Sequence, residues 1–458
     1  MDIIAAISTG ANPTAIGIVR VSGEGCFALC DKVFRPGGGK DFSAAESRKM
    51  IYGEMLDQNG RVIDRGLAVR FPGPGSYTGE DSAEFHCHGS PVVLRELLGA
   101  LFAQGARQAA AGEFTRRAFL NGRLDLTQAE AVVDLIDAET AAAARNAAAQ
   151  LDGSLRRDFE AITDRLLDIT SRFYAVVDYP DEDIEDLGVE EITAALQASE
   201  NTLTRLLATC GRGRVLKNGV RTAIVGRPNA GKSSLLNALA GYERAIVTNI
   251  PGTTRDTVEE SVLCGGVRLR LIDTAGIRDT GDVVERMGVE RSRKAVETAD
   301  LVLAVVDSSV PFTTEDTAVL EMAAAHPAWI LVGSKRDLPT APVPFLRFTQ
   351  SQYPPAARVC VSAVTGEGLE ELEEAVAALF PEGELSDGEI LTNLRQQEAA
   401  LRARDAIRRA REALDSGLTP DAVLTDAEEA LDALGELTGR TAREEIVSRI
   451  FERFCVGK

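Results

Sequence analysis

The sequence predicts a multidomain chain in which an α+β region, residues 1–118, precedes an all-α domain that is interrupted by an α/β domain. Apolar residues at helical spacing fill residues 119–215 and again 381–458, whereas residues 216–380 alternate apolar strands with helices. The simplest interpretation is a single helical domain with the α/β domain inserted into it. Two separate helical modules are the alternative that the spacing leaves open.

The first 118 residues alternate short apolar runs with glycine-rich turns. Residues 16–21 and 66–71 have the composition of strands, and the Pro-Gly-Pro-Gly run at 72–75 predicts a loop. Residues 91–104 predict a helix. Strands and a helix in this order are typical of an α+β fold.

Helical spacing begins at Phe119 and returns after the α/β block. Four apolar stripes carry it, comprising Leu126, Ala129, Val133 and Ile136; Leu151, Leu155, Phe159, Ile162, Leu166, Ile169 and Phe173, over about six turns; Ile192, Leu196, Leu203 and Leu207; and Leu394, Leu401, Ile407 and Leu414. The acidic stretch 178–186 predicts a solvated loop between the second stripe and the third.

Composition narrows the class of protein. The 458 residues carry a formal net charge of −20, which opposes non-specific binding to nucleic acid. An RNA partner therefore has to meet a local basic patch or be brought by another protein. Seven cysteines without a CxxC pair indicate reduced thiols rather than a disulfide framework or a zinc site. No long apolar run or secretion signal occurs, so we expect a cytosolic chain without a membrane span.

A phosphate-binding loop is the most specific motif. The strand 220–225 leads into Gly226-Arg-Pro-Asn-Ala-Gly-Lys-Ser, which satisfies GxxxxGK[ST], and a helix over 234–240 follows. Backbone amides at the helix N-terminus hold phosphates there. We expect Lys232 to reach the β- and γ-phosphates and the Ser233 hydroxyl to bind Mg²⁺.

Further motifs complete a Ras-like P-loop G domain that binds and hydrolyses GTP. Residues 269–273 form a strand that ends in the DxxG motif Asp273–Gly276, whose aspartate belongs to the Mg²⁺ shell. Thr254 is the expected switch threonine for Mg²⁺. Buried strands follow at 301–307 and 329–333, and Ser362-Ala363 supplies the last loop that faces the base.

The base-recognition motif departs from its usual form NKxD, because Ser334 stands in place of Asn before Lys335, Arg336 and Asp337. Asp337 can still accept hydrogen bonds from guanine N1 and N2. We therefore predict guanine-selective binding that the lost amide contact weakens by about 1 kcal/mol, the size of a net hydrogen bond.

Hydrolysis needs a group that orients water, and Ile277, which follows DxxG, cannot do so. Asn229 in the phosphate loop offers a side-chain carbonyl, and a monovalent cation held there would neutralise transition-state charge. Glu285 lies in the second switch segment and is a candidate to position water. Spacing alone favours a solvated helix charge for Glu285.

The whole chain resembles the MnmE (TrmE) family of bacterial tRNA-modification GTPases, within the TrmE-Era-EngA-YihA-Septin-like superfamily. The matching segments lie in every predicted domain: Tyr77-Thr-Gly-Glu-Asp81, His86-Cys-His-Gly89, residues 119–126, Gln128-Ala-Glu-Ala131, the G motifs and Phe454-Cys-Val-Gly-Lys458. The resemblance implies an N-terminal domain that dimerises and binds 5-formyl- or methylene-tetrahydrofolate, a helical domain, and an inserted G domain.

The resemblance also implies potassium-stimulated hydrolysis through transient G-domain dimerisation, with K⁺ held by Asn229, Thr248, Ile250 and Thr253 and with Glu285 acting in hydrolysis. Motifs and resemblance together give a nucleotide-binding set: Asn229, Ala230, Gly231, Lys232, Ser233, Ser234, Thr248, Asn249, Ile250, Pro251, Gly252, Thr253, Thr254, Asp273, Thr274, Ala275, Gly276, Ser334, Lys335, Arg336, Asp337, Ser362, Ala363 and Val364.

By the same resemblance, Arg20, Glu80, Arg123 and Lys458 contact the folate; Arg123 stands where Lys is common, and Gln396, which stands where His is frequent, is given no role. Cys455 is either a reactive thiol that supports one-carbon chemistry or a packed cysteine at a domain junction. His86 and His88 form a weak metal pattern, and we favour structural or pterin-pocket roles for them.

The family acts with the flavoprotein MnmG (GidA), as a heterotetramer, to add an aminomethyl or carboxymethylaminomethyl group to C5 of the wobble uridine of certain tRNAs. A ribosome-assembly-type GTPase switch without modification activity is the alternative, but no KH-type GXXG occurs in a suitable context. A folate-dependent transferase alone would leave the G domain unexplained.

Overall fold

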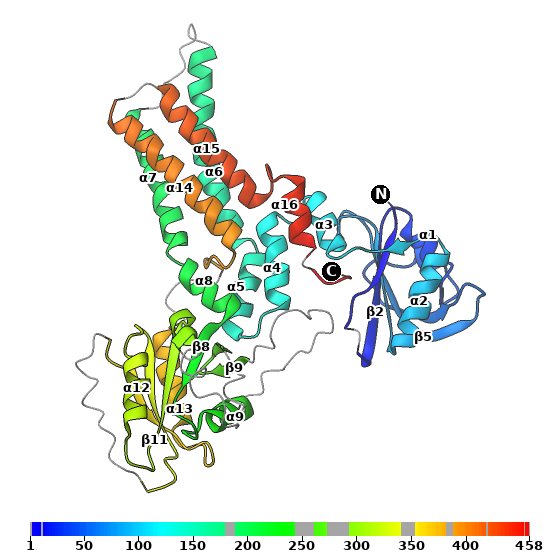
Figure 1. Cartoon of the computed structure of the whole chain (residues 1–458). Coiled ribbons are helices and arrows are strands. Elements are labelled where there is room, and N and C mark those ends of the chain that lie inside the picture. Colours follow the sequence, from blue (N-terminus) through cyan, green and yellow to red (C-terminus); the bar gives the residue numbers. More distant parts are fainter. Residues whose placement is uncertain are drawn as a thin grey trace. The chain divides into compact units, whose positions relative to one another are not determined.

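The computed structural model describes residues 2–10, 12–178, 188–242, 261–272, 293–339, 353–381, 388–417, 420–452 and 454–457 (Figure 1). The chain divides into two compact units. The first comprises Met1–Val133, Ala149–Thr204 and Glu398–Lys458, and the second comprises Asp134–Ala148 and Arg205–Gln397. A mixed sheet with a helical bundle belongs to the first unit and an α/β domain to the second, which confirms the predicted multidomain fold class.

A seven-stranded sheet forms the N-terminal domain in the order β3-β4-β5-β6-β2-β1-β7. Its strands are β1 (Ile4–Ile7), β2 (Thr14–Ser22), β3 (Phe34–Pro36), β4 (Ile51–Leu56), β5 (Val62–Phe71), β6 (Ser82–Gly89) and β7 (Arg107–Gln108), and its helices are α1 (Cys26–Cys30), the 3₁₀ turn η1 (Phe42–Ala44), α2 (Pro91–Ala103) and α3 (Glu113–Leu120). All neighbouring strands are antiparallel except β1 and β7. The predicted strands and helix are therefore present.

Alternation along β6 shows how this sheet presents one polar face. Ala83, Phe85 and Cys87 are buried in the core that α2 covers, whereas Glu84 and His86 between them lie on the other face. Arg20 on β2 pairs in register with Glu84 on β6, so the two side chains share that face. The strand pattern thus places charged groups next to each other outside the core.

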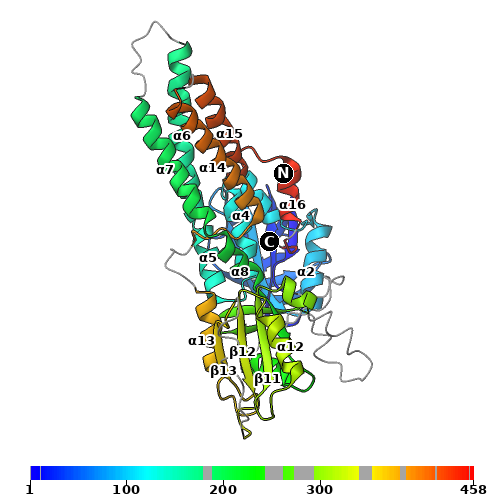
Figure 2. The ribbon, with the colours of Figure 1, turned by 60° about the vertical axis from the view of Figure 1, so that its left-hand side comes forward.

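Helices make up the rest of the first unit and the flanks of the second. They are α4 (Leu126–Ile136), α5 (Ala141–Leu151), α6 (Ser154–Asp178), α7 (Val189–Leu207), α8 (Cys210–Asn218), α14 (Leu394–Asp415), α15 (Pro420–Thr438) and α16 (Glu444–Phe451). Figures 1 and 2 show α6, α7, α14 and α15 lying side by side. Within the described residues, no helix combines the length and apolarity that a membrane crossing requires.

One helical prediction needs correction. The apolar spacing from Leu151 to Phe173 predicted a continuous helix, but α5 ends at Leu151 and α6 begins at Ser154. Gly153 between them has φ 85°, a left-handed conformation that glycine adopts readily and that ends a helix. The acidic stretch 178–186 falls almost wholly outside the described residues.

The α/β domain contains a six-stranded sheet in the order β13-β12-β11-β8-β10-β9. Its strands are β8 (Val220–Val225), β9 (Ser261–Cys264), β10 (Val267–Leu271), β11 (Leu301–Asp307), β12 (Trp329–Ser334) and β13 (Ala357–Cys360), and its labelled helices are α9 (Lys232–Tyr242), α12 (Thr314–Ala323) and α13 (Leu369–Leu379). Among the described strands of this sheet, only β9 runs antiparallel to its neighbour.

Both faces of this sheet are covered, as a mostly parallel sheet requires. Along β11, Leu301, Leu303 and Val305 pack with α9 and α13, whereas Val302, Ala304 and Val306 pack with α12. Every residue of β11 is buried. The carboxyl ends of these strands meet at one edge, which is where ligands bind in open α/β sheets.

Polar contacts hold together the two chain segments that connect the α/β domain to its helices. The Asp134 carboxylate accepts a hydrogen bond from the Thr392 hydroxyl and pairs with Lys217 of α8, both at 2.8 Å. The Asn146 side chain accepts from the Gly388 amide and donates to the Ile390 carbonyl. Helix α8, which leads into the α/β domain, and residues 388–392, which leave it, are therefore both bonded to α4. Residues 388–392 are bonded to α5 as well.

Candidate functional site

The phosphate loop joins β8 to α9. Asn229 and Gly231 have φ of 60° and 96°, so the loop turns sharply before α9 begins at Lys232. The Lys232 ammonium donates to the carbonyl oxygens of Gly226 (2.7 Å) and Arg227 (2.8 Å). Burial lowers the pKa of Lys232. A cation and the amides of an 11-residue helix therefore converge on one loop, which favours anion binding.

An ion pair that the sequence did not reveal anchors the same loop. Arg227 Nε lies 3.1 Å from Oδ1 of Asp316, whose side chain is almost wholly buried. Oδ2 of Asp316 accepts from the amide and the hydroxyl of Thr313, the residue before α12. The capping box of α12 thus orients the carboxylate that holds the phosphate loop.

The base-recognition loops lie beyond β12 and β13. Asp337 is exposed, and one of its carboxylate oxygens accepts from the Ser362 hydroxyl at 2.7 Å. Lys335 has φ 60° and its ammonium lies 2.6 Å from Asp307 at the end of β11. Burial raises the pKa of Asp307, but hydrogen bonds from Lys335 and Ser309 outweigh it and hold that pKa below its usual range. The structure thus brings Asp337 and Ser362 together.

The structure describes some of the other residues predicted to bind the nucleotide and its metal ions, but not all of them. Asn229 is exposed, Ala230 is buried beneath the loop, Ser233 and Ser234 lie in the first turn of α9, and Val364 is 85% exposed. Residues 248–254, 273–276 and Glu285 lie outside the described residues. The assignments of Mg²⁺ and K⁺ ligands there, and the role of Glu285, remain predictions.

The predicted folate residues gather around one turn of the N-terminal domain. The Arg20 guanidinium donates to Glu84 at 2.9 Å and lies 5.6 Å from the ring centroids of both Tyr77 and Phe114. Glu80 accepts from the Ser22 hydroxyl at 3.0 Å, and Ser22 follows Arg20 on the same face of β2. Arg123 also reaches this turn, because its Cγ lies beside Gly79.

Arg117 on α3 is the residue of this cluster that sequence reasoning missed. Its guanidinium is 5% exposed and donates to Glu80 (2.9 Å), to Glu113 (3.0 Å) and to the carboxylate and carbonyl of Asp2 (both 2.9 Å). Burial raises the pKa of Glu113, but hydrogen bonds from Arg107, the Ala110 amide and Arg117 outweigh it and hold that pKa at about 2. Arg117 therefore fixes the Glu80 carboxylate.

The C-terminal segment returns to the N-terminal domain. Val456 forms a β-bridge with Ala111, and the Ser8 hydroxyl donates to the Gly457 carbonyl at 3.1 Å. Cys455, which directly precedes Val456, is exposed, and its carbonyl accepts from the Gly112 amide at 3.4 Å. Lys458 lies outside the described residues.

The two histidines of the sequence motif pair with carboxylates. His88 Nδ1 lies 2.9 Å from an oxygen of Asp64, and Nε2 of His86 lies 3.4 Å from Glu84. The described residues contain no group of three His, Cys, Asp or Glu side chains that could hold a metal ion. Gln396 is buried.

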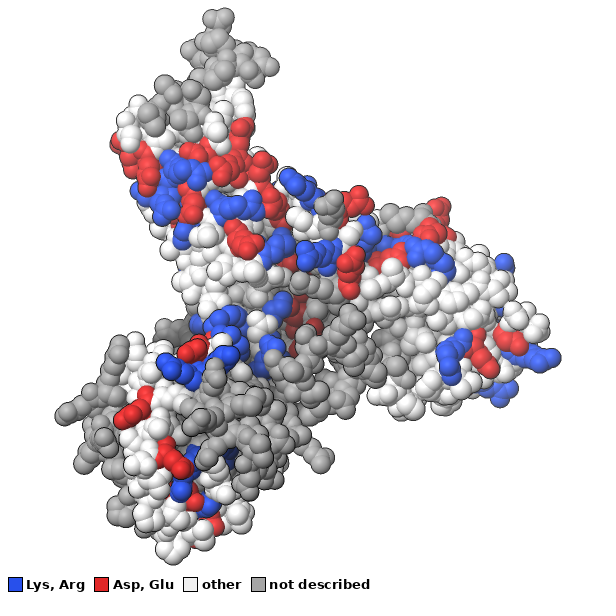
Figure 3. Space-filling model, in the orientation of Figure 1, with Lys and Arg blue, Asp and Glu red and all other residues white. Residues whose placement is uncertain are grey.

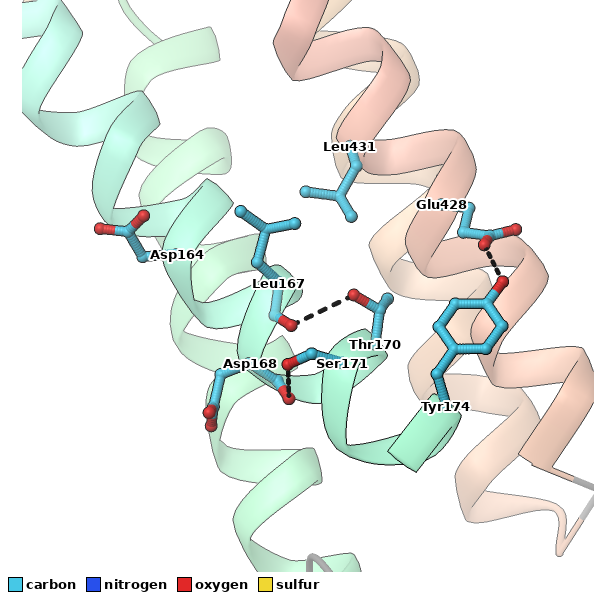
Figure 4. A pocket seen from close by; sticks show the side chains of 8 residues that line it. All are labelled: Asp164, Leu167, Asp168, Thr170, Ser171, Tyr174, Glu428 and Leu431. Atoms are coloured by element: carbon cyan, nitrogen blue, oxygen red, sulfur yellow. Dashed lines mark hydrogen bonds between the residues drawn. The ribbon is translucent and has the colours of Figure 1, made fainter. Parts of the chain in front are cut away.

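A hollow of about 630 Å³ opens between α6 and α15 of the helical bundle (Figure 4). Leu167 and Leu431 face it beside the carboxylates of Asp164, Asp168 and Glu428, and the Tyr174 phenol donates to Glu428. None of the predicted site residues lines it, so we assign it no part in the proposed chemistry.

The chain is similar to known proteins along its full length. Residues 3–123 match the family model described as GTP-binding protein TrmE N-terminus, and residues 126–455 match the MnmE helical domain. The tRNA modification GTPases MnmE of Roseiflexus sp. and Symbiobacterium thermophilum are 44% and 45% identical to the chain, and that of Heliobacterium modesticaldum is 44% identical. Each alignment covers 100% of this chain and 99% of the relative. The chain therefore belongs to the MnmE (TrmE) family.

Proposed function

We propose that this chain is a GTPase of tRNA modification. In this proposal it acts with the flavoprotein MnmG (GidA) to place an aminomethyl or carboxymethylaminomethyl group on C5 of the wobble uridine of certain tRNAs. The observation that carries the proposal is the full-length similarity to relatives named tRNA modification GTPase MnmE. A homodimer that joins the flavoprotein in a heterotetramer is part of it.

The α/β domain supplies GTP hydrolysis. Lys232 and the amides that open α9 bind the β- and γ-phosphates, and the exposed Asp337 carboxylate accepts from guanine. Ser233, at the start of the same helix, is proposed to bind Mg²⁺ together with Thr254 and Asp273. Bound Mg²⁺ would neutralise charge that develops on the phosphates.

A potassium ion is proposed beside the phosphate loop. Asn229 is exposed, so its side-chain oxygen is accessible to a cation, and Thr248, Ile250 and Thr253 are the further proposed ligands. Glu285 is proposed to position the attacking water. Hydrolysis by dimerised G domains then times the conformational change of the complex.

GTP turnover is expected to be at least about tenfold faster in potassium chloride than in sodium chloride at equal ionic strength, since a cation at Asn229 stabilises transition-state charge. Steady-state phosphate release measures this. Asn229→Gly is the matched variant, because glycine adopts φ 60° without strain and removes only the side chain. Equal rates of the parent protein in both salts would remove potassium from the proposal.

The N-terminal domain is proposed to hold the one-carbon donor, methylene- or 5-formyl-tetrahydrofolate, through Arg20, Glu80, Arg123 and Lys458. The cluster fits such a ligand, because the Arg20 guanidinium lies 5.6 Å from the centroids of two aromatic rings and Arg117 holds the Glu80 carboxylate. Cys455 is exposed on the segment that pairs with this domain, which makes its thiol accessible for one-carbon chemistry.

The charged side chains of the helical bundle bear on how tRNA binds to the complex. On the face of the helical bundle seen in Figure 3, basic and acidic side chains alternate. Between α14 and α15 of this bundle, Arg402 pairs with Glu436, and Arg409 pairs with Asp426 and Glu429. Together with the net charge of −20, this pairing favours a tRNA that the flavoprotein partner brings.

Cells that lack this protein are expected to contain tRNA with unmodified C5 at the wobble uridine, because no other group in the proposed complex supplies the GTPase step. Nucleoside analysis of digested tRNA by mass spectrometry measures the change, and the intact gene supplied on a plasmid is the control. Unchanged wobble uridines would instead favour the ribosome-assembly-type GTPase switch.

A further inference from the structure

Ser334 stands where the base-recognition motif usually has Asn, and the structure gives its hydroxyl a specific partner. The side chain is 5% exposed. Its Oγ donates to the carbonyl of Ala230 in the phosphate loop at 2.5 Å, and a second carbonyl, that of Val306 on β11, lies 3.2 Å away. A residue of the base-recognition loop is thus bonded to the loop that holds the phosphates.

Close packing fixes Ser334 in this position. The Ser334 carbonyl accepts from both the amide (3.1 Å) and the hydroxyl of Ser308. A Cβ placed on Gly231 would lie only 3.2 Å from Cβ and Oγ of Ser334, so the two loops are in contact. The hydroxyl therefore has little freedom to turn toward another acceptor.

The number of protons that this side chain can donate decides whether it can also bind the guanine base. A hydroxyl has one proton to donate, whereas the Asn carboxamide has two. Both neighbours of Ser334 Oγ are carbonyl oxygens, which only accept, so its proton is committed to the protein. The N7 edge of guanine offers acceptors and needs a donor. Ser334 has none left to offer.

We propose that Ser334 is a positioning residue, which ties the base-recognition loop to the phosphate loop, and that guanine N7 receives no hydrogen bond from this position. Guanine is then read through Asp337, whose carboxylate Ser362 orients at 2.7 Å. This inference rests on the proposed function as a GTP-binding protein. It keeps the lost amide contact that the sequence predicts and adds a contact between loops as the role of Ser334.

The first test uses the unaltered protein with GTP and with 7-deaza-GTP, in which a C–H group replaces N7. Fluorescence competition titration gives the two dissociation constants. We expect them to agree within about twofold, because no donor is lost, whereas a lost hydrogen bond would cost about fivefold. A penalty of about fivefold or more for 7-deaza-GTP would overturn the inference.

Two variants separate the contact between loops from base reading. Ser334→Ala should weaken the binding of GTP and 7-deaza-GTP by the same factor, about three- to tenfold, because the loop contact is lost and no base contact is. Ser334→Asn restores a donor to Ala230 and adds one for N7, so a preference of about fivefold for GTP over 7-deaza-GTP should appear. Unchanged affinity of a folded Ser334→Ala protein would overturn the positioning role.

A third variant distinguishes failure of this inference from failure of the proposed function. Asp337→Asn should shift the preference from GTP to XTP, because a carboxamide can donate to the C2 carbonyl of xanthine. This shift, with equal binding of GTP and 7-deaza-GTP by the parent protein, supports the inference. A parent protein that binds no guanine nucleotide would refute the proposed function, whereas one that binds GTP but discriminates against 7-deaza-GTP would refute the role of Ser334 alone.

Discussion

Replacing Lys232 with alanine is expected to lower kcat/KM for GTP hydrolysis by at least about 100-fold, the size of the loss when one preorganised donor to a developing charge is removed. Lys232 is the first residue of α9, and its ammonium is already held in the phosphate loop by the carbonyls of Gly226 and Arg227. Burial lowers the pKa of this ammonium, and the phosphates of a bound nucleotide would favour its charged form. Phosphate release under limiting GTP measures the effect.

Two matched variants test whether the loss belongs to the loop. Lys232→Arg keeps the charge but replaces a compact ammonium with a planar fork, so most of the activity should still be lost. Lys49→Ala removes a lysine that is 66% exposed and pairs with the exposed Glu46, and it should leave turnover unchanged. Turnover by a folded Lys232→Ala protein within about threefold of the parent, well short of the effect expected for a lost donor, would contradict the assignment of this loop.

Local patterns in the sequence were enough to predict most elements that position the site. The run 301–307 is a strand whose residues are all buried, and residues 91–104 form a helix that ends one residue earlier, at Ala103. The phosphate loop follows β8 and precedes α9 as its motif requires. These features depend on neighbours a few residues away, so periodicity and turn residues suffice to predict them.

Contacts between residues far apart along the chain could not be predicted from the sequence. Ser334 bonds to Ala230, 104 positions away, and Arg117 donates to Asp2, 115 positions away. Composition shows that such groups are polar, but it cannot show which partner burial will enforce. The same limit explains the break before α6, since glycine at 153 marked a possible turn while the apolar spacing on both sides continued.

Replacing Arg117 with methionine is expected to destabilise the N-terminal domain by about 3–5 kcal/mol, the cost of removing one partner from a buried ion pair. Methionine preserves much of the apolar stem, so the change isolates the guanidinium. Glu80 would keep only the Ser22 hydroxyl among its side-chain partners described above, while its own side chain is 12% exposed. Native-state hydrogen exchange of peptides that span β2 and α3 measures the lost protection. Folate binding should fall together with it, because Glu80 is no longer held.

Arg116→Met is the matched control, because Arg116 neighbours Arg117 on α3. Its side chain is 36% exposed, and its ion pair is with Glu444, an exposed residue 3.4 Å away. Loss of this exposed pair should cost less than about 1 kcal/mol. Trp329, the single tryptophan, lies buried in the α/β domain, so its fluorescence should report the same unfolding there in both variants.

The pKa of Glu113 is lowered to about 2 from 4.5, so its contribution to stability is present above pH 4.5 and is lost as the pH falls toward 2. The difference between parent and Arg117→Met should therefore shrink over that range, and a difference that stays constant down to pH 2 would show that packing, rather than charge, makes Arg117 necessary.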